Sequence, residues 1–187
     1  LWLCLWQRRW RLLGLAPMAV GYATLFFVTP PSVLISNDAK LVAVRSAQGD
    51  YMPSHGHGGN WTEDNWTQRA AAAMESAWPK RGDSADGRLS CDGATCIYRA
   101  EGHTVGIVRR RDNVAAACRS TDLVISPVAA HYNCSGATLI DSVDTWKRGG
   151  HAIWLSPDGI SIESVMDWRG SRPWTHDPVP RRARGEN

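Results

Sequence analysis

The longest stretch without a charged residue is the strongest constraint on this chain. Residues 12–29, LLGLAPMAVGYATLFFVT, are eighteen uncharged positions, and as a helix they nearly cross a hydrocarbon core of ~30 Å. Arg8, Arg9 and Arg11 precede the run, and no basic residue follows it before Lys40. Because basic flanks stay on the cytoplasmic side, the sequence predicts a transmembrane helix over 12–29 that leads out of the cytoplasm.

The residues before this run suggest further membrane segments. Residues 1–6, LWLCLW, look like the end of an earlier hydrophobic segment, joined to 12–29 by a basic turn. We therefore expect the chain to be the C-terminal end of a larger polytopic protein. A single-pass protein with tryptophan anchors in residues 1–11 is the alternative. A cleaved signal peptide is disfavoured by the length of the run and by the lack of a small-x-small cleavage site.

The cysteines fit an exported domain. Four of the five follow the apolar run, at Cys91, Cys96, Cys118 and Cys134, and an even number is typical of an oxidising compartment. Cys91 and Cys96 bracket the turn-rich DGAT, so we prefer the pairs 91–96 and 118–134, although four cysteines allow three pairings. Four reduced, buried cysteines in a cytoplasmic domain remain the alternative. Zinc is less supported, because no second close pair completes a ligand set.

The rest of the chain alternates β-rich and helical patterns. Hairpins are predicted at 32–45 and 151–164, a meander at 88–108, and a short helix at 112–120 between two strand candidates. A further helix is predicted from Thr62 until Pro79 ends it, after a polar loop over 46–65. Hairpins at both ends with strand-helix-strand elements between them predict an α/β sandwich with mixed sheets. The resulting division is a membrane segment at 1–31, a domain at 32–175 and a disordered tail at 176–187.

Two stretches resemble a known family. RWRLLGLAP at 9–17 and GGHAIWLSPDGISIESVMDWRGSRPW at 149–174 resemble the C-terminal region of bacterial competence DNA-internalisation proteins, the ComEC family, and the resemblance extends from residue 1 to about 175. It implies a multi-pass channel in the bacterial inner membrane that takes up single-stranded DNA. It also implies a metallo-β-lactamase-like domain on the periplasmic side, with the rest of the channel and other competence proteins as partners.

The metal-binding motif of active metallo-β-lactamase-like enzymes, HxHxDH, is not intact here. Its first two positions would be His55 and His57, but Gly59 and Asn60 stand where the Asp and the third His are required. Two glycine-flanked histidines are weak candidates, since they supply too few ligands for a stable metal site. No other catalytic motif occurs. We therefore expect a degenerate domain without catalytic residues, metal or cofactor.

Basic residues beside tryptophans are the candidates for DNA contact, although the net charge of +3 does not by itself indicate nucleic-acid binding. Arg109, Arg110 and Arg111 follow a predicted strand, and Lys147 and Arg148 adjoin Trp146. Such clusters suit single-stranded DNA, because charges track the phosphates and rings stack on bases. Solvated loops are the simpler interpretation of both. A third group, in DWRGSRPW at 167–174, is expected to dock the tail onto its own domain.

The predicted function is therefore a non-catalytic structural or DNA-guiding module of an uptake channel for natural competence. A metal-dependent nuclease using His55 and His57 is the first alternative. A membrane-tethered extracytoplasmic binding domain unrelated to competence is the second.

Overall fold

The chain forms two compact units, Leu1–Pro30 and Pro31–Asn187. In the first, helix α2 covers Leu15–Thr24 and buries none of its residues. Among the residues described, no helix has both the length and the hydropathy needed to cross a membrane. The transmembrane helix expected over 12–29 stays a prediction. The computed structural model describes residues 14–24, 27–55, 62, 65, 66, 68, 77–130 and 134–170.

The first sheet of the second unit, sheet A, is antiparallel throughout. Its strand order is β11-β10-β1-β2-β3, so the earliest strand lies between its hairpin partner and a strand from the far end of the chain. In this register Val33 aligns with Val44 on one side and with Ile153 on the other. The strands are β1 (Val33–Ile35), β2 (Val42–Arg45), β3 (Tyr51–Pro53), β10 (His151–Ser156) and β11 (Gly159–Ser164).

The second sheet, sheet B, is mixed. It has the order β4-β5-β6-β7-β8-β9, antiparallel up to β7 and parallel from β7 to β9. The parallel pairing of β7 and β8 requires a crossover, which the helix α4 supplies. The strands are β4 (Gly82–Asp83), β5 (Leu89–Cys91), β6 (Thr95–Ala100), β7 (His103–Val108), β8 (Leu123–Ile125) and β9 (Thr138–Ile140).

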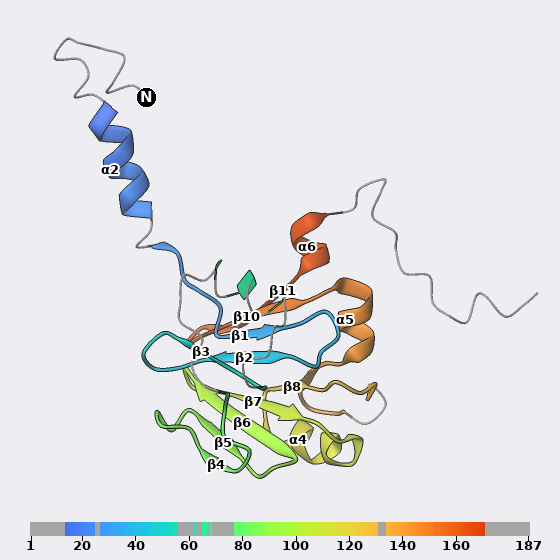
Figure 1. Ribbon diagram of the computed structural model, residues 1–187. Helices are drawn as coiled ribbons and strands as arrows, with labels where there is room; N and C mark the ends of the chain where they lie inside the picture. The colour runs from blue at the N-terminus through green and yellow to red at the C-terminus, as the bar shows by residue number, and fades with distance from the viewer. Residues whose placement is uncertain are drawn as a thin grey trace, which may run out of the picture. The chain divides into compact units, whose positions relative to one another are not determined.

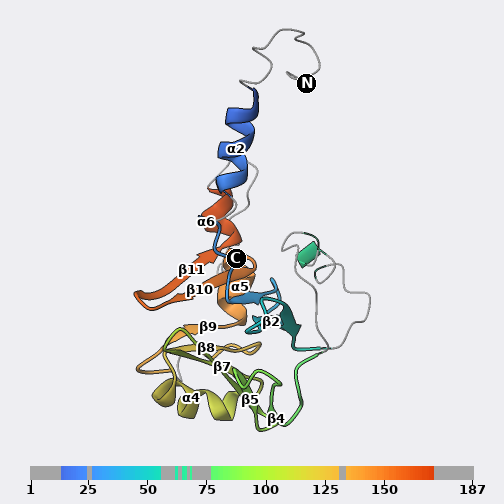
Figure 2. The same cartoon turned by 90° about the vertical axis from the view of Figure 1, so that its left-hand side faces the viewer.

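The core lies between the two sheets. Its largest cluster combines sheet A residues such as Ile35 and Ile153 with sheet B residues such as Leu89, Tyr98 and Leu123. A smaller cluster packs α4 against the other face of sheet B. Figures 1 and 2 show this order of layers, with α4 on the side of sheet B that faces away from sheet A. The α/β class with mixed sheets, predicted from the sequence, is therefore confirmed.

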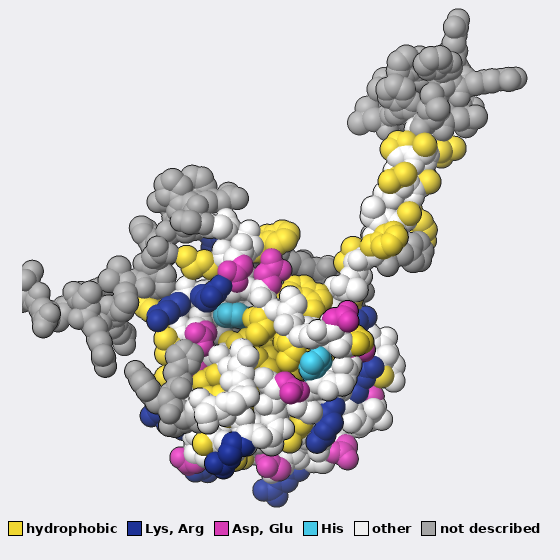
Figure 3. Space-filling view, turned by 180° about the vertical axis from the view of Figure 1, so that it is seen from behind, with side chains coloured by type: hydrophobic (Ala, Val, Ile, Leu, Met, Phe, Trp, Pro, Cys, Tyr) yellow, Lys and Arg dark blue, Asp and Glu magenta, His cyan; other side chains and the backbone are white. Residues whose placement is uncertain are grey.

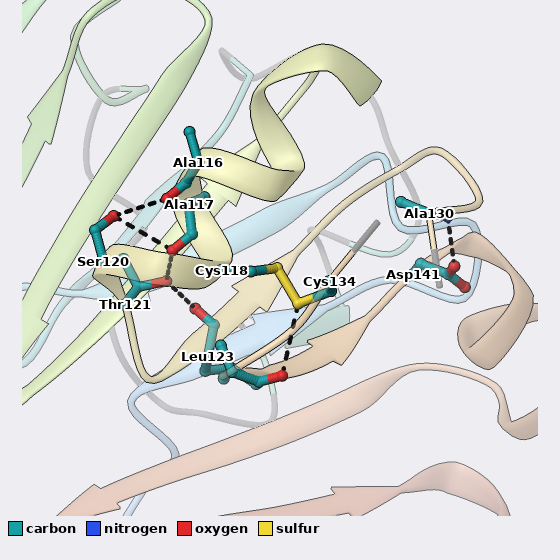
Figure 4. The surroundings of a disulfide bond; sticks show 10 residues. Ala116, Ala117, Cys118, Ser120, Thr121, Leu123, Ala130, Cys134 and Asp141 are labelled. Carbon is teal, nitrogen blue, oxygen red and sulfur yellow. Dashed lines mark hydrogen bonds between the residues drawn. A yellow bond between two sulfur atoms is a disulfide. The ribbon is translucent and has the colours of Figure 1, made fainter. Parts of the chain in front are cut away.

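Helix α4 (Val114–Ser120) follows a short 3-10 turn at Arg111–Asn113 and lies close to β7. Gly106 permits this close approach, because a Cβ there would lie 3.2 Å from Thr121 Oγ1 and 3.3 Å from Thr121 Cγ2, which is tight for a side-chain contact. Beyond this contact, Cys118 forms a disulfide with Cys134 (Figure 4). The bond ties α4 to the segment that leads into β9.

The second disulfide joins Cys91 to Cys96, which face each other across β5 and β6. Asp92 shapes the turn between them by accepting hydrogen bonds from the backbone N–H groups of Ala94 (2.9 Å) and Thr95 (2.7 Å). Both cysteines are buried. The structure thus contains the two pairs that we preferred from the sequence.

Two short helices complete the second unit. Both begin with a capping box, in which an N-cap side chain and the residue three positions later bond each other's backbone. In α5 (Ser142–Arg148) the pair is Asp141 and Asp144, and in α6 (Val165–Arg169) it is Ser164 and Asp167. Helix α5 connects the end of β9 to the start of β10, so the two sheets are joined through it.

The structure also corrects some expectations. The two predicted hairpins are confirmed, and both lie in sheet A, where β1 pairs with β10. The polar loop expected over 46–65 contains β3, and the polar sequence KRGDSADG at 80–87 contains β4. Of the helix predicted from Thr62 to Pro79, most residues lie outside the described part. Among those described, 62, 65, 66 and 68 are helical, whereas 77 and 78 are not.

Candidate nucleic-acid interface

One edge of the sandwich collects strand ends from both sheets. In sheet A, β1 ends there beside the start of β10, since Ile35 pairs with His151. In sheet B, the parallel strands β7, β8 and β9 end at a common edge. The Arg109 Nη2 group donates to the carbonyl oxygen of Ser54 at 3.3 Å, which connects the end of β7 to the end of β3. We call this side of the domain the strand-end edge.

The three arginines predicted to meet phosphates lie on the strand-end edge, and all three are exposed. The Arg111 Nη2 group donates to the carbonyl oxygen of Ala129 at 2.7 Å. Arg110 forms an ion pair with Asp112 at 3.4 Å, and its side chain is 71% exposed. Arg109 and Arg111 thus use part of their donors to hold loops, whereas Arg110 presents its guanidinium to solvent.

The second predicted cluster is joined to the first through a buried carboxylate. Next to Ala129, the backbone N–H of Ala130 donates to Asp141 Oδ2 at 2.8 Å. Asp141, which is 0% exposed, caps the helix that carries Trp146, Lys147 and Arg148. Residues 109–111 and 146–148, separate in sequence, therefore lie along the same edge.

The edge continues onto α6. Arg148 forms an ion pair with Asp167 at 2.5 Å and donates from Nε to Ser164 Oγ at 3.3 Å. Trp146 is 53% exposed and Trp168 is 80% exposed. The expectation that DWRGSRPW docks onto its own domain is therefore wrong for Trp168, because that ring faces solvent; residues 171–174 lie outside the described part.

The carboxylate at this end of the edge keeps its charge under all ordinary conditions. A hydrogen bond from the Ser164 hydroxyl, the Ser164 backbone N–H and the Arg148 guanidinium together lower the pKa of Asp167 to about 2. Asp167 offsets Arg148 and Asp112 offsets Arg110, so the described cations of the edge without a carboxylate ion pair of this kind are Arg109, Arg111 and Lys147.

We expect Ser164→Ala to raise the pKa of Asp167 more than Arg148→Gln does, because the serine hydroxyl makes the larger contribution. A carboxylate whose pKa is lowered by folding stabilises the folded state at pH values above the pKa of the unfolded chain, which is about 3.9 for Asp. That stabilisation is lost as the pH falls towards 2. Titration of the Asp167 carboxyl carbon by NMR in each variant measures both shifts, and a larger shift in Arg148→Gln would contradict this ranking.

His151 is buried at the same edge and differs from the arginines in charge. It exposes 6% of its surface, and burial lowers the pKa of its imidazole, an effect that the nearby Asp144 carboxylate partly offsets. The ring is therefore neutral at pH 7, and its Nδ1 atom has no hydrogen-bond partner. It does not add to the positive charge of the edge.

The described histidines do not form a metal site. His55 is exposed, and its Nδ1 atom lies 2.9 Å from Ser54 Oγ. His103 contacts the carbonyl oxygen of Ser156 through Nε2 at 3.0 Å. His57 and His131 lie outside the described part. Within the described ranges, no three His, Cys, Asp or Glu side chains are placed to hold a metal ion. The described residues alone do not supply a ligand set for the metal that the family resemblance implies for active enzymes.

Sequence reasoning overlooked the residues that hold the edge together. Asp141 links the loop at Ala130 to α5. The pattern DSVD at 141–144 could have indicated this role, since an acidic residue followed three positions later by another resembles a capping box. No comparable signal marks Ser54, whose backbone carbonyl accepts from Arg109.

Comparison with known proteins finds no family model, curated protein or solved structure that matches this chain. The features of the fold and the strand-end edge are therefore the evidence on which function is argued.

Proposed function

We propose that this chain is the C-terminal part of an inner-membrane channel for single-stranded DNA uptake in natural competence, and that its second unit guides DNA without cutting it. The proposal combines the sequence resemblance to the ComEC family with the geometry of the strand-end edge. In this proposal residues 12–29 cross the membrane and the domain that follows lies on the periplasmic side.

The observation that carries the proposal is the common placement of two basic clusters and two exposed tryptophans. Lys147 and Arg110 extend into solvent along the same edge as Trp146 and Trp168. Proteins that bind single strands without sequence preference combine charges along the backbone with rings on which bases stack. Exposed cations can contact the phosphates and exposed indoles can stack on the bases. The alternative of a solvated loop does not account for the exposed indoles.

Two further features support the location. Helix α2 exposes large apolar side chains, among them Val20 (65%) and Tyr22 (66%), as expected of a helix that contacts lipid. The two disulfides are typical of a compartment that oxidises thiols. The departure from the HxHxDH pattern at Gly59 and Asn60 favours a guiding role over a nuclease.

Binding to DNA tests the edge directly. We expect Arg110→Glu with Lys147→Glu to weaken binding of a fluorescent oligothymidylate about tenfold at low salt. Each lost phosphate contact should also reduce the slope of log K against log salt by about 0.7. These two residues are chosen because Arg109, Arg111 and Arg148 hold parts of the fold. Anisotropy titrations of the 187-residue chain in detergent supply the dissociation constants.

The matched control reverses two exposed arginines at the opposite end of the strands. Arg99 pairs with Thr104 near the start of β7, and Arg119 lies in the last turn of α4. Arg99→Glu with Arg119→Glu changes the net charge by the same amount as the test pair. We expect binding within about twofold of wild type, because neither residue lies on the edge. Equal loss in both pairs would show that net charge alone attracts DNA and would refute the interface.

A transformation assay in the encoding host tests the biological role. Deletion of residues 32–187 from the complete protein should abolish entry of DNA into the cytoplasm while capture at the cell surface continues. Unchanged transformation would instead favour a binding domain unrelated to competence. Cleavage of single-stranded DNA that a chelator and His57→Ala both abolish would favour the nuclease.

A further inference from the structure

Four strands form the outer edges of the two sheets, and three of them are poor templates for another strand. Strand β3 is short, fully buried and ends in a proline, and β4 has two residues and includes Asp83. Strand β9 has three residues. Short edges, prolines and charges are the usual protection against pairing with another chain. These three edges are therefore protected.

Apart from the charge of Glu163, strand β11 lacks these protections. Its six residues pair with β10 in an unbroken register, without a bulge. The sequence GISIES contains no proline and no basic residue, and Glu163 is its only charge. Among the described strands of sheet A, β11 has a neighbour on one side only. An exposed, regular edge strand of this length is a site at which another strand can add.

The backbone of β11 offers hydrogen-bonding groups at alternate residues. The two-residue turn at 157–158 makes Ser156 and Gly159 a hydrogen-bonded pair, so Ile160 and Ile162 direct their N–H and C=O groups away from β10. Two contacts agree with this alternation. Ser164 donates its backbone N–H to Asp167 Oδ2 at 3.0 Å, and Val165 donates to the carbonyl oxygen of Gly150 at 2.9 Å.

The same residues leave apolar surface uncovered. Ile160 is partly buried against the core, and Ile162, on the same face of the strand, is 36% exposed. Figure 3 looks onto the side of the sandwich where β11 lies and shows apolar side chains gathered at the centre of that view. A strand added to β11 would satisfy the outward backbone groups and cover these isoleucines together.

We propose that β11 pairs with β11 of a second copy of this chain, antiparallel and about a two-fold axis at Ile162. In this register Ile162 lies opposite its counterpart, and the two N–H and C=O groups of that pair bond each other. Ile160 lies opposite Ser164, whose C=O accepts even though its N–H is already used. Glu163 lies opposite Ser161, so the strand's one charge meets a hydroxyl instead of a like charge.

This self-complementarity is why a second copy is the occupant. In this register the side chains of opposite residues in the two copies lie on the same side of the sheet, as antiparallel pairing requires. The apolar pair at Ile162 continues the inner face of sheet A, and the polar pair of Ser161 with Glu163 continues the outer face. Such an isologous contact closes as a dimer and leaves no further edge strand of this kind exposed. The proposal is independent of any role in DNA uptake.

Two measurements on the 187-residue chain in detergent test the dimer. Light scattering should give twice the single-chain protein mass for the wild type and the single-chain mass for Ile162→Pro. Proline removes the outward N–H while the pairing with β10 stays intact. Ile162→Val keeps the N–H and the branched side chain, so it should remain a dimer.

Residue-resolved hydrogen exchange supplies the second readout. In the wild type, the amides of Ile160 and Ile162 should exchange about tenfold or more slowly at high than at low protein concentration. The amides of Ser161 and Glu163 face β10 and should stay slow at both concentrations, which makes them an internal control. If Ile162→Pro fails to fold, this exchange pattern decides alone. Fast exchange at 160 and 162 with single-chain mass at the highest concentration, or a dimer of undiminished affinity in folded Ile162→Pro, would overturn the proposal.

Discussion

Replacing Asp141 with alanine is expected to lower the free energy of unfolding by about 3 kcal/mol. The carboxylate is fully buried and accepts from the backbone N–H groups of Val143 (2.7 Å), Asp144 (3.3 Å) and Ala130 (2.8 Å). Its removal leaves buried donors without an acceptor at the start of α5 and in the loop after β8. Loss of a helix cap and of a charged hydrogen-bond acceptor both contribute to this value.

Two variants separate the cap from the loop contact. Asp141→Asn keeps one carbonyl-type oxygen, so it should retain the cap at α5 but lose the acceptor for Ala130. Asp144→Ala removes only the reciprocal half of the capping box, in which Asp144 Oδ2 accepts from the Asp141 N–H at 3.1 Å, and should cost about 1 kcal/mol or less. Urea unfolding followed by circular dichroism measures all three. A cost in Asp141→Ala no larger than in Asp144→Ala would show that the buried carboxylate does not hold the edge.

Removing the disulfide between Cys118 and Cys134 is the second change with a large expected effect. Cys118→Ala with Cys134→Ala should lower the free energy of unfolding by about 3 kcal/mol, because the bond closes a loop between residues 16 positions apart. The Cys91 to Cys96 bond closes a separation of 5. Its removal should cost about 2 kcal/mol or less, since Asp92 already shapes that turn.

Urea titration of the two double variants without reductant measures how much free energy of unfolding is lost with each disulfide. Thiol counting on freshly purified, unreduced wild type should find Cys4 as the only reactive thiol. A reversed ranking would contradict the loop-length argument. Five free thiols in the native chain would contradict both the disulfides and the proposed oxidising compartment.

Local structure was largely predictable from the sequence. The hairpin of β1 and β2, the meander of β5 to β7 and the helix α4 follow from alternating apolar residues and turn residues that need no distant partner. Strand β3 was missed because all three of its residues are buried, so it shows no alternation, and β4 is too short for a period. The pairing of Val33 with Ile153 was not predictable either, since alternation gives the faces of a strand but not its neighbour.

The candidate site was predictable only in pieces. Arg109–Arg111 and Trp146–Arg148 stood out as basic and aromatic clusters, but nothing in either cluster indicates that Ala129, Ala130 and Asp141 join them at one edge. That relation depends on the parallel arrangement of β7, β8 and β9, which forms only through long-range contacts. The departure from the HxHxDH pattern at Gly59 and Asn60, by contrast, is a property of residue identity and was visible directly.

The central position of β1 in sheet A fixes when this domain can become complete. Its neighbour β10 begins more than a hundred residues later, at His151. During synthesis, one side of β1 therefore stays unpaired until nearly the whole unit has been made. Closing so long a loop is slow compared with forming hairpins. A chain that stops before residue 151 would therefore lack β10 and β11 and would expose β1, a central strand of the finished domain, as an unpaired edge of sheet A.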